Sequence, residues 1–439
     1  MKLHPLLSTC SATICTAIND TTTIQHKEKS QPPMPKHLFS DTSSCSISDT
    51  TTTSPSFDTS YSSLHSSLSL QTLPSIPSLQ KLSPENLNVA VSNSYLTSLN
   101  PSPAGHVSFL AVNKNLLYAA SSNLIHVFDT TLFTLVDIFS VNNSSSGSVK
   151  SVTFHNGSVF TSHQDSKIRV WKLTENKRHK HVGTLPTLED RLLLSVFKRN
   201  YVNVRRHRRR LWIEHHDAVS GLAMINDLQM CSISWDKYLK IWKTSNLRCV
   251  QSIKAHDDAI NAVVVSADGT IYTGSADRRI KVWAKPIGED KHALIATLEK
   301  HKSGVNALAL NNAGSVLFSG SCDRSILVWE KEDSANHMAV TGALRGHSKA
   351  ILCLITVFDL LLSGSADRTV RIWQRAVAGK FCCLAILDGH KQPVRSLVAD
   401  ADSNVAQSKS TIKVFSGSFR GEIKIWKVEE VLRLDNNDS

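Results

Sequence analysis

The chain has 439 residues, with 49 Lys or Arg against 37 Asp or Glu, so its formal net charge is +12. This balance favours anionic partners without identifying one. No apolar run reaches the roughly 18–20 residues of a membrane-spanning helix, which argues against a membrane protein. The nine Cys residues include no CxxC pair, which argues against a disulfide framework and a zinc ribbon and fits a reducing compartment.

Residues 1–88 differ in composition from the rest of the chain. The first 80 residues contain 31 Ser or Thr and only nine charged residues. Such a segment buries too little apolar surface to offset its chain entropy, so we predict a disordered tail over residues 1–88. Its Ser and Thr residues fit either a solvated spacer or a phosphorylation platform. Its extreme N-terminus fits a plain tail better than a transit peptide or a secretory signal.

From residue 106 onward, a unit of about 43 residues recurs. Residues 273–283 read TGSADRRIKVW, and residues 363–373 read SGSADRTVRIW. Five copies place an Asp six residues before a Trp, namely Asp165/Trp171, Asp236/Trp242, Asp277/Trp283, Asp323/Trp329 and Asp367/Trp373. Four copies also place a His 26 to 28 residues before that Trp, namely His216, His256, His301 and His347.

Each unit has the pattern of four short strands. The residues after the Asp alternate polar and apolar, as in residues 369–373, which is typical of a half-buried strand. A single small sheet cannot bury both of its faces, whereas seven sheets packed radially can. We therefore predict an all-β, seven-bladed propeller over residues 89–430, followed by a flexible tail over residues 431–439.

These units resemble the repeats of the WD40 family of β-propellers, which carry Gly-His near the start and Trp-Asp near the end. The chain departs from the family because none of its six repeat-ending Trp residues is followed by Asp. The resemblance implies a structural hydrogen-bond network in each sheet, completed in one unit by Ser363 or Ser365. Its predicted members are His216, Asp236, Trp242, His256, Asp277, Trp283, His301, Asp323, Trp329, His347, Asp367 and Trp373.

The same His, Ser and Asp residues would otherwise suggest a catalytic triad. Because the set recurs in successive units, we predict no catalytic residue, and we also predict no metal site and no cofactor. The family closes its ring with an N-terminal strand, for which residues 95–99 are the candidate. Arg420 replaces the Asp of the last unit, and Ser122 and Phe128 replace the Asp and Trp of the first. We predict that these two adjoining blades are the least stable.

A long insertion separates the units that end at Trp171 and Trp242. Residues 174–210 hold eleven Lys or Arg against three acidic residues. The densest part is a basic cluster formed by Lys198, Arg199, Arg205, Arg206, Arg208, Arg209 and Arg210. Three interpretations remain open: a solvated loop, a nuclear import signal, or a site for nucleic acid or another polyanion. Residues 188–197 fit a short helix whose Leu192, Leu193 and Val196 would anchor the insertion against the propeller.

The insertion also resembles a segment of the JINGUBANG-like group of plant WD40 proteins. The order TLPTLEDRLL, NYV and then VRRHRRRLWIEHHDAVSGL carries this likeness. It implies a plant regulatory adaptor that has no catalytic activity and is found in the cytoplasm and the nucleus.

The turn residues on either side of each Asp form a candidate partner-binding rim around the propeller axis. The candidate residues are Trp235, Phe419, Lys237, Arg278, Arg324 and Arg368. They fit either ordinary turns or a ring of cations around two exposed aromatic side chains, which would suit an acidic or phosphorylated peptide.

The sequence as a whole predicts a monomeric, non-enzymatic scaffold that binds proteins through its loop rim. It predicts no membrane association. The alternative is a regulator that binds nucleic acid or another polyanion through residues 198–210.

Overall fold

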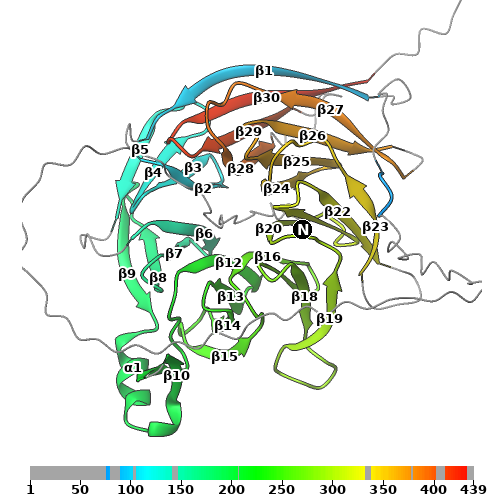
Figure 1. Cartoon of the computed structure of the whole chain (residues 1–439). Coiled ribbons are helices and arrows are strands. Elements are labelled where there is room, and N and C mark those ends of the chain that lie inside the picture. Colours follow the sequence, from blue (N-terminus) through cyan, green and yellow to red (C-terminus); the bar gives the residue numbers. More distant parts are fainter. Residues whose placement is uncertain are drawn as a thin grey trace, which may run out of the picture. The chain divides into compact units, whose positions relative to one another are not determined.

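The computed structural model describes residues 76–79, 89–101, 105–140, 147–205, 207–331, 338–376, 379–401 and 411–432. Seven four-stranded antiparallel sheets surround a central axis (Figure 1). The innermost strands contact one another in a closed circle in the order β2, β6, β12, β16, β20, β24, β28 and back to β2. The prediction of an all-β, seven-bladed propeller is thus confirmed.

The first four blades follow one another along the chain, with the innermost strand first in each. Blade 1 contains β2 (Val107–Asn113), β3 (Leu116–Ser121), β4 (Leu124–Asp129) and β5 (Leu135–Phe139). Blade 2 contains β6 (Val149–His155), β7 (Ser158–His163), β8 (Ile168–Leu173) and β9 (His179–Leu185). Blade 3 contains β12 (Val219–Asn226), β13 (Gln229–Ser234), β14 (Tyr238–Lys243) and β15 (Cys249–Lys254). Blade 4 contains β16 (Ile260–Val265), β17 (Ile271–Ser275), β18 (Arg279–Ala284) and β19 (Ala293–Glu299).

The remaining blades include the one that closes the ring. Blade 5 contains β20 (Val305–Leu310), β21 (Val316–Ser321), β22 (Ile326–Lys331) and β23 (Met338–Leu344). Blade 6 contains β24 (Ile351–Val357), β25 (Leu360–Ser365), β26 (Val370–Arg375) and β27 (Phe381–Leu387). Blade 7 contains β28 (Val394–Ala401), β29 (Thr411–Ser418), β30 (Ile423–Leu432) and the N-terminal strand β1 (Val89–Leu99).

The recurring Ser-Gly-Ser of the repeats has a packing explanation. A Cβ atom on Gly320 would lie 2.5 Å from Cγ2 of Ile351, at the start of the innermost strand of the next blade. A Cβ on Gly417 would lie 2.6 Å from Cγ1 of Val107 in the same way. Glycine at this position therefore lets neighbouring sheets approach closely enough to bury their apolar faces against each other.

Blade 7 joins the two ends of the propeller. Strand β1 pairs antiparallel with β30, from Val89 opposite Leu432 to Leu99 opposite Ile423. The closing strand is thus longer than the five residues expected from the sequence, and β30 runs two residues into the segment predicted as a C-terminal tail. Residues 433–439 lie outside the described part of the chain.

The predicted N-terminal tail, residues 1–88, lies outside the described residues except for positions 76–79. There the prediction of disorder is wrong, because Ser78 forms a parallel β-bridge with Ala343 of blade 5. We call residues 76–79 the tail segment. Two apolar side chains in it, Ile76 and Leu79, pack against the propeller core, so composition averaged over 88 residues concealed a local anchor.

The insertion between blades 2 and 3 is shorter than predicted. Residues 179–185 belong to β9, the outermost strand of blade 2, so the inserted elements begin after Leu185. They are α1 (Leu188–Ser195), the 3-10 helix η3 (Lys198–Asn200), and the antiparallel pair β10 (Tyr201–Arg205) and β11 (Arg208–Leu211). In Figure 1, α1 and β10 project from the outer edge of the ring.

Candidate functional site

Each of blades 3 to 6 contains its own chain of hydrogen bonds, which links a Trp, a Ser or Thr, a His and an Asp. In blade 6, Nε1 of Trp373 donates to Oγ of Ser363 at 2.8 Å, Nε2 of His347 lies 2.8 Å from the same oxygen, and Nδ1 of His347 lies 2.8 Å from Asp367. Since the carboxylate only accepts, Nδ1 carries the proton and the Ser363 hydroxyl donates to Nε2. The sequence left Ser363 and Ser365 open, and the structure selects Ser363.

The other three complete chains have the same geometry. In each, the His lies 2.7 to 2.9 Å from both the hydroxyl and the Asp, and the Trp donates to that hydroxyl at 2.8 to 3.0 Å. Their members are His215, Ser232, Asp236 and Trp242 in blade 3; His256, Thr273, Asp277 and Trp283 in blade 4; and His301, Ser319, Asp323 and Trp329 in blade 5.

The assignment of His216 to the blade 3 network is wrong. Its neighbour His215 is buried and makes both hydrogen bonds. His216 contributes its backbone N–H to Asp236 at 3.0 Å, while its ring lies 3.4 Å from that carboxylate and keeps a fifth of its side chain exposed. The buried His256, His301 and His347 occupy the same structural position as His215, so all four imidazoles take part in the hydrogen-bond networks of their sheets.

The carboxylates of the network are held in their charged form. Hydrogen bonds and attraction from the facing imidazole outweigh burial and lower the pKa of Asp277 to about 2. The pKa values of Asp236, Asp323 and Asp367 are lowered further for the same reason. Burial lowers the pKa of His215 despite the nearby carboxylate, which keeps its ring neutral and its tautomer fixed at neutral pH.

Blades 2 and 7 carry altered versions of the network. In blade 2, Trp171 donates to Thr161, which contacts His163 from its own strand, while Asp165 pairs with Arg169. In blade 7, Trp426 and His390 both contact Ser416, and Nδ1 of His390 lies 3.4 Å from Glu422. Glu422 thus stands near the place of the missing Asp at a longer distance.

In blades 3 to 6, the residue after the network Asp is a cation with an unusual backbone conformation. Lys237, Arg278, Arg324 and Arg368 have φ values of 76°, 75°, 72° and 75°, respectively. This left-handed region is unfavourable for residues with a Cβ. The three Arg side chains are exposed, whereas Nζ of Lys237 donates to the backbone oxygen of Asp257 at 2.6 Å.

The two aromatic residues predicted for the rim each face a cation that the sequence analysis did not select. Nζ of Lys150 lies 5.1 Å from the ring centroid of Trp235, and Cζ of Arg395 lies 6.0 Å from that of Phe419. The ring of His106 stacks on Phe419 with centroids 5.7 Å apart. We call these five residues the channel-mouth cluster, which spans blades 7, 1, 2 and 3.

The position of the two cations within their strands explains their orientation. Lys150 and Arg395 are each the second residue of an innermost strand. At that position, Ser108, Ser220, Asn261 and Asn306 reach across to a backbone oxygen of the next blade at 2.5 to 3.1 Å. Two of the seven blades thus place a long cation where four others place a short polar side chain that ties neighbouring blades together.

Burial makes the channel-mouth cluster electrostatically strained. It lowers the pKa of Lys150 to about 8, with a further contribution from the charge on Arg395. Burial also lowers the pKa of Arg395 to about 10. The pKa of His106 falls for the same reasons, with burial first and then repulsion from both cations. An anionic group placed here would reverse these shifts, because it would stabilise each positive charge.

The insertion is fixed to the propeller by charged side chains. Nε of Arg248 lies 3.0 Å from Oδ1 of Asp190, and Nε of Arg191 lies 2.8 Å from Oε1 of Glu214. Thr187 caps helix α1 by accepting a hydrogen bond from the backbone N–H of Asp190. Because these polar contacts hold the helix in place, its attachment does not require its apolar side chains to pack against the propeller.

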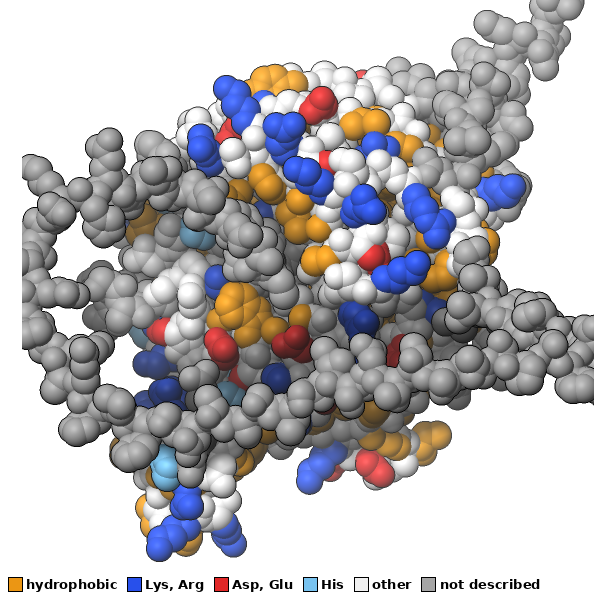
Figure 2. Space-filling model, viewed as in Figure 1, with side chains coloured by type: hydrophobic (Ala, Val, Ile, Leu, Met, Phe, Trp, Pro, Cys, Tyr) orange, Lys and Arg blue, Asp and Glu red, His pale blue; other side chains and the backbone are white. Residues whose placement is uncertain are grey.

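The prediction that Leu192, Leu193 and Val196 anchor the insertion is therefore wrong. Their side chains are 61%, 57% and 73% exposed, and Phe197 is 53% exposed. Helix α1 presents an apolar surface to solvent, although Asp190 in its first turn is buried and pairs with Arg248. Figure 2 shows hydrophobic side chains together with Lys and Arg at the end of this projection.

The described part of the basic cluster lies beside that apolar surface. Lys198 and Arg199 are exposed on η3, and Arg208 and Arg209 are exposed on β11. Arg210 points the other way, since its Nη1 donates to the backbone oxygen of His215 at 3.2 Å. The backbone of Arg205 pairs with that of Arg208 across the two strands, and Arg206 lies outside the described residues.

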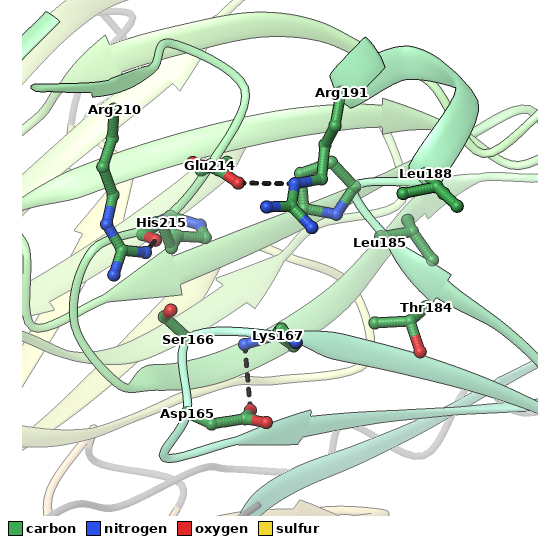
Figure 3. A pocket seen from close by; sticks show the side chains of 11 residues that line it. Asp165, Ser166, Lys167, Thr184, Leu185, Leu188, Arg191, Arg210, Glu214 and His215 are labelled. Carbon is green, nitrogen blue, oxygen red and sulfur yellow. Dashed lines mark hydrogen bonds and ion pairs between the residues drawn. The ribbon is translucent and has the colours of Figure 1, made fainter.

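A cavity of about 600 Å³ lies where the insertion meets blades 2 and 3. Its wall includes Asp165, Lys167, Arg191, Arg210 and Glu214 (Figure 3). Arg191 and Glu214 pair with each other across the wall, and Asp165 pairs with Arg169. Since both acidic side chains of this wall are already paired with Arg residues, the cavity is a weaker candidate for a ligand site than the channel-mouth cluster.

The described residues contain neither a membrane-spanning helix nor a cluster of metal-binding side chains. None of the helices they form is long and apolar enough to cross a membrane. No three His, Cys, Asp or Glu side chains among them gather as metal ligands would.

Comparison with known proteins identifies the repeats. The family model "WD domain, G-beta repeat" matches residues 247–284, 292–330, 339–374 and 381–427. The chain is 34% identical over 83 residues to Protein Notchless from Drosophila melanogaster, which is 19% of this chain and 16% of that protein. It is 31% identical over 74 residues to an uncharacterized WD repeat-containing protein from Schizosaccharomyces pombe, which is 16% of this chain and 14% of that protein.

The aligned part therefore spans only 16% and 14% of the two relatives' own length. The WD40 repeat model thus matches four segments within residues 247–427, and the seven sheets of the described residues form a β-propeller.

Proposed function

We propose that this protein is a non-catalytic scaffold that holds an acidic or phosphorylated segment of a partner protein at the mouth of its central channel. The observation that carries the proposal is the channel-mouth cluster, in which Lys150 and Arg395 are buried cations flanked by Trp235 and Phe419. WD40 propellers generally bind other proteins, which supports the class of partner.

The electrostatics favour an anion over other ligands. Two cations in a partly desolvated channel attract a carboxylate or phosphate more strongly than they would in water. The aromatic rings beside them offer flat apolar surface to the remainder of a peptide. A phosphorylated residue carries about two negative charges near neutral pH, so it fits two neighbouring cations well.

The absence of catalysis is supported by where the triad-like residues lie. The imidazoles of His256, His301 and His347 have side chains that are no more than 1% exposed. Both of their ring nitrogens are engaged within the sheet. A general base must reach the proton that it removes from a substrate, and these rings have no such access.

Binding of defined probes tests the proposal. The protein is titrated with a labelled phosphoserine peptide and with a hexa-aspartate peptide, and fluorescence anisotropy is measured. The double variant Lys150→Met and Arg395→Met keeps much of the side-chain volume and removes both charges. We expect at least tenfold weaker binding, which corresponds to about 1.4 kcal/mol.

A matched control removes a cation elsewhere. Lys172→Met changes an exposed residue near the far end of β8, so its affinity for both probes should equal that of the wild type. Equal affinity for the double variant and the wild type would refute the proposal. Capture of partners by a Trp235→Ala and Arg278→Ala variant extends the test to the rim, where we expect fewer copurified partners at unchanged thermal stability.

A second candidate function is supported by the insertion. Arg208 and Arg209 are exposed on a two-stranded ribbon next to the apolar side of α1, an arrangement that suits nucleic acid or another polyanion. Binding to mixed-sequence DNA or RNA that weakens steeply with salt, and that is lost on neutralising residues 198–210, would favour this function. Binding that persists after neutralisation would exclude it.

We further propose a role in a plant regulatory complex in the cytoplasm and the nucleus. This rests on the likeness of the insertion to the JINGUBANG-like group and on its basic cluster. Microscopy of a fluorescent fusion, compared with a variant in which residues 198–210 are neutralised, tests the placement. Loss of nuclear signal is the expected result, and an unchanged distribution would remove the cluster as an import signal.

A further inference from the structure

The outer wall of the propeller holds a short peptide of the chain itself at the seam between blades 5 and 6. The tail segment, residues 76–79, lies along β23, the outermost strand of blade 5. Its backbone pairs with Ala343 through two hydrogen bonds, from Leu79 N–H to Ala343 at 3.1 Å and from Ala343 N–H to Pro77 at 2.9 Å. A short blue arrow beside β23 in Figure 1 marks this contact.

The same segment also contacts blade 6. The N–H of Phe381, the first residue of β27, donates to the backbone oxygen of Leu79 at 2.8 Å. Nη2 of Arg345 donates to the backbone oxygen of Ile76 at 3.1 Å. Four hydrogen bonds over four residues therefore join the segment to two different blades, so it spans the seam instead of merely extending one sheet.

The side chains of the segment divide into a half-buried pair and an exposed pair. Ile76 packs against the cluster that contains Met338 and Ala343, and Leu79 packs against the cluster that contains Phe381. Pro77 and Ser78 are exposed. Recognition thus combines backbone pairing at a strand edge, as in strand addition, with apolar contacts at two positions three residues apart.

Gly342 shapes the seam for Leu79. A Cβ atom on Gly342 would lie 2.3, 2.7 and 2.9 Å from three side-chain carbons of Leu79. Real Cβ atoms do not approach other carbons so closely, so any larger residue at position 342 would displace the leucine. A glycine in the middle of an edge strand weakens the strand itself, and here it opens room for an incoming side chain.

We propose that the seam between β23 and β27 is a peptide-binding groove for an extended segment of the form apolar–Pro–Ser–Leu, and that its occupant is this chain's own tail segment bound in cis. The groove holds residues 76–79 against the outermost strand of blade 5. The groove and the channel-mouth cluster are separate surfaces, so a negative result for the groove would leave the proposed function unaffected.

The tail segment is covalently linked to the propeller, so it competes with any free peptide for the groove. Nine residues separate Leu79 from Val89 of β1. A linker of this length gives an effective concentration on the order of 1 mM. If the free peptide binds with a Kd of about 0.1 mM, an occupied groove should bind it about tenfold more weakly than an emptied one.

Hydrogen exchange in the full chain reads groove occupancy directly. The amides of Ala343 and Phe381 donate to the tail segment, so both should be protected in the wild type. Leu79→Asp should release them and leave core amides of β24 protected, which shows that the propeller is still folded. Ser78→Ala changes an exposed side chain and serves as the matched control with unchanged protection.

Addition of the peptide LPSIPSLQ (residues 73–80) to the Leu79→Asp variant tests whether the groove accepts a ligand. We expect restored protection at both amides and about tenfold tighter binding than to the wild type. Gly342→Val combined with Leu79→Asp should abolish peptide binding. Failure of the peptide to protect the emptied groove would overturn the proposal. Concentration-dependent dimers in light scattering would overturn the assignment of the occupant in cis.

Discussion

Replacing His215 by Ala, beside a His216→Ala control, tests the hydrogen-bond network at the point where sequence and structure disagree. His215→Ala removes two hydrogen bonds of 2.8 Å from a buried site, to Asp236 and to Ser232. Each stranded buried partner costs about 1–3 kcal/mol. Both partners keep other donors, because Asp236 retains the N–H of His216 and Ser232 retains Trp242. The lower half of that range therefore applies to each.

Adding about 1 kcal/mol for the cavity left by the imidazole gives a loss of about 3–5 kcal/mol in the free energy of unfolding. The His216 ring is partly exposed and 3.4 Å from the carboxylate, so its removal should cost less than about 1 kcal/mol. Urea unfolding followed by Trp fluorescence at neutral pH measures both variants. Equal losses, or a larger loss for His216→Ala, would refute the reasoning.

Two further predictions concern stability. Burial lowers the pKa values of His390 and His292 to about 4, while in the unfolded chain they titrate near 6.5. The unfolded state therefore binds more protons, and the urea midpoint should fall as pH drops from about 6.5 to about 4; a flat profile over that range would contradict this. Blades 1 and 7 lack a complete network, so their amides should exchange faster than those of blades 4 to 6, and uniform protection by mass spectrometry would argue against it.

The fold was predictable because its determinants repeat. The Asp and Trp spacing marks the same turn and strand in five blades, and the small Ser-Gly-Ser residues mark the same interblade contact. The choice between His215 and His216 was not predictable by counting. The separation of His from Asp is 21, 21, 22 and 20 residues in the four complete networks, and the range admits either residue.

The candidate site was predictable in part. The turn motif pointed to Trp235 and Phe419, but their cationic neighbours come from other blades and lie far away in sequence. Lys150 and Arg395 can be recognised as unusual only when the innermost strands are aligned and the residues at their second position are compared. Four blades have Ser or Asn at that position. The orientation of helix α1 was predicted wrongly because amphipathic spacing does not reveal whether an ion pair, such as Asp190 with Arg248, already anchors the helix.

The pairing of β1 with β30 constrains how the protein is made. Strand β1 leaves the ribosome first among the propeller strands, yet the strand that it pairs with is the last to emerge. At about 5–20 residues per second, β1 waits about 20–70 s for that partner. During this time six sheets can assemble while the seventh remains open, with Tyr95 and Val91 lacking the strand that later lies beside them. Nascent chains stalled before residue 423 should therefore associate with chaperones.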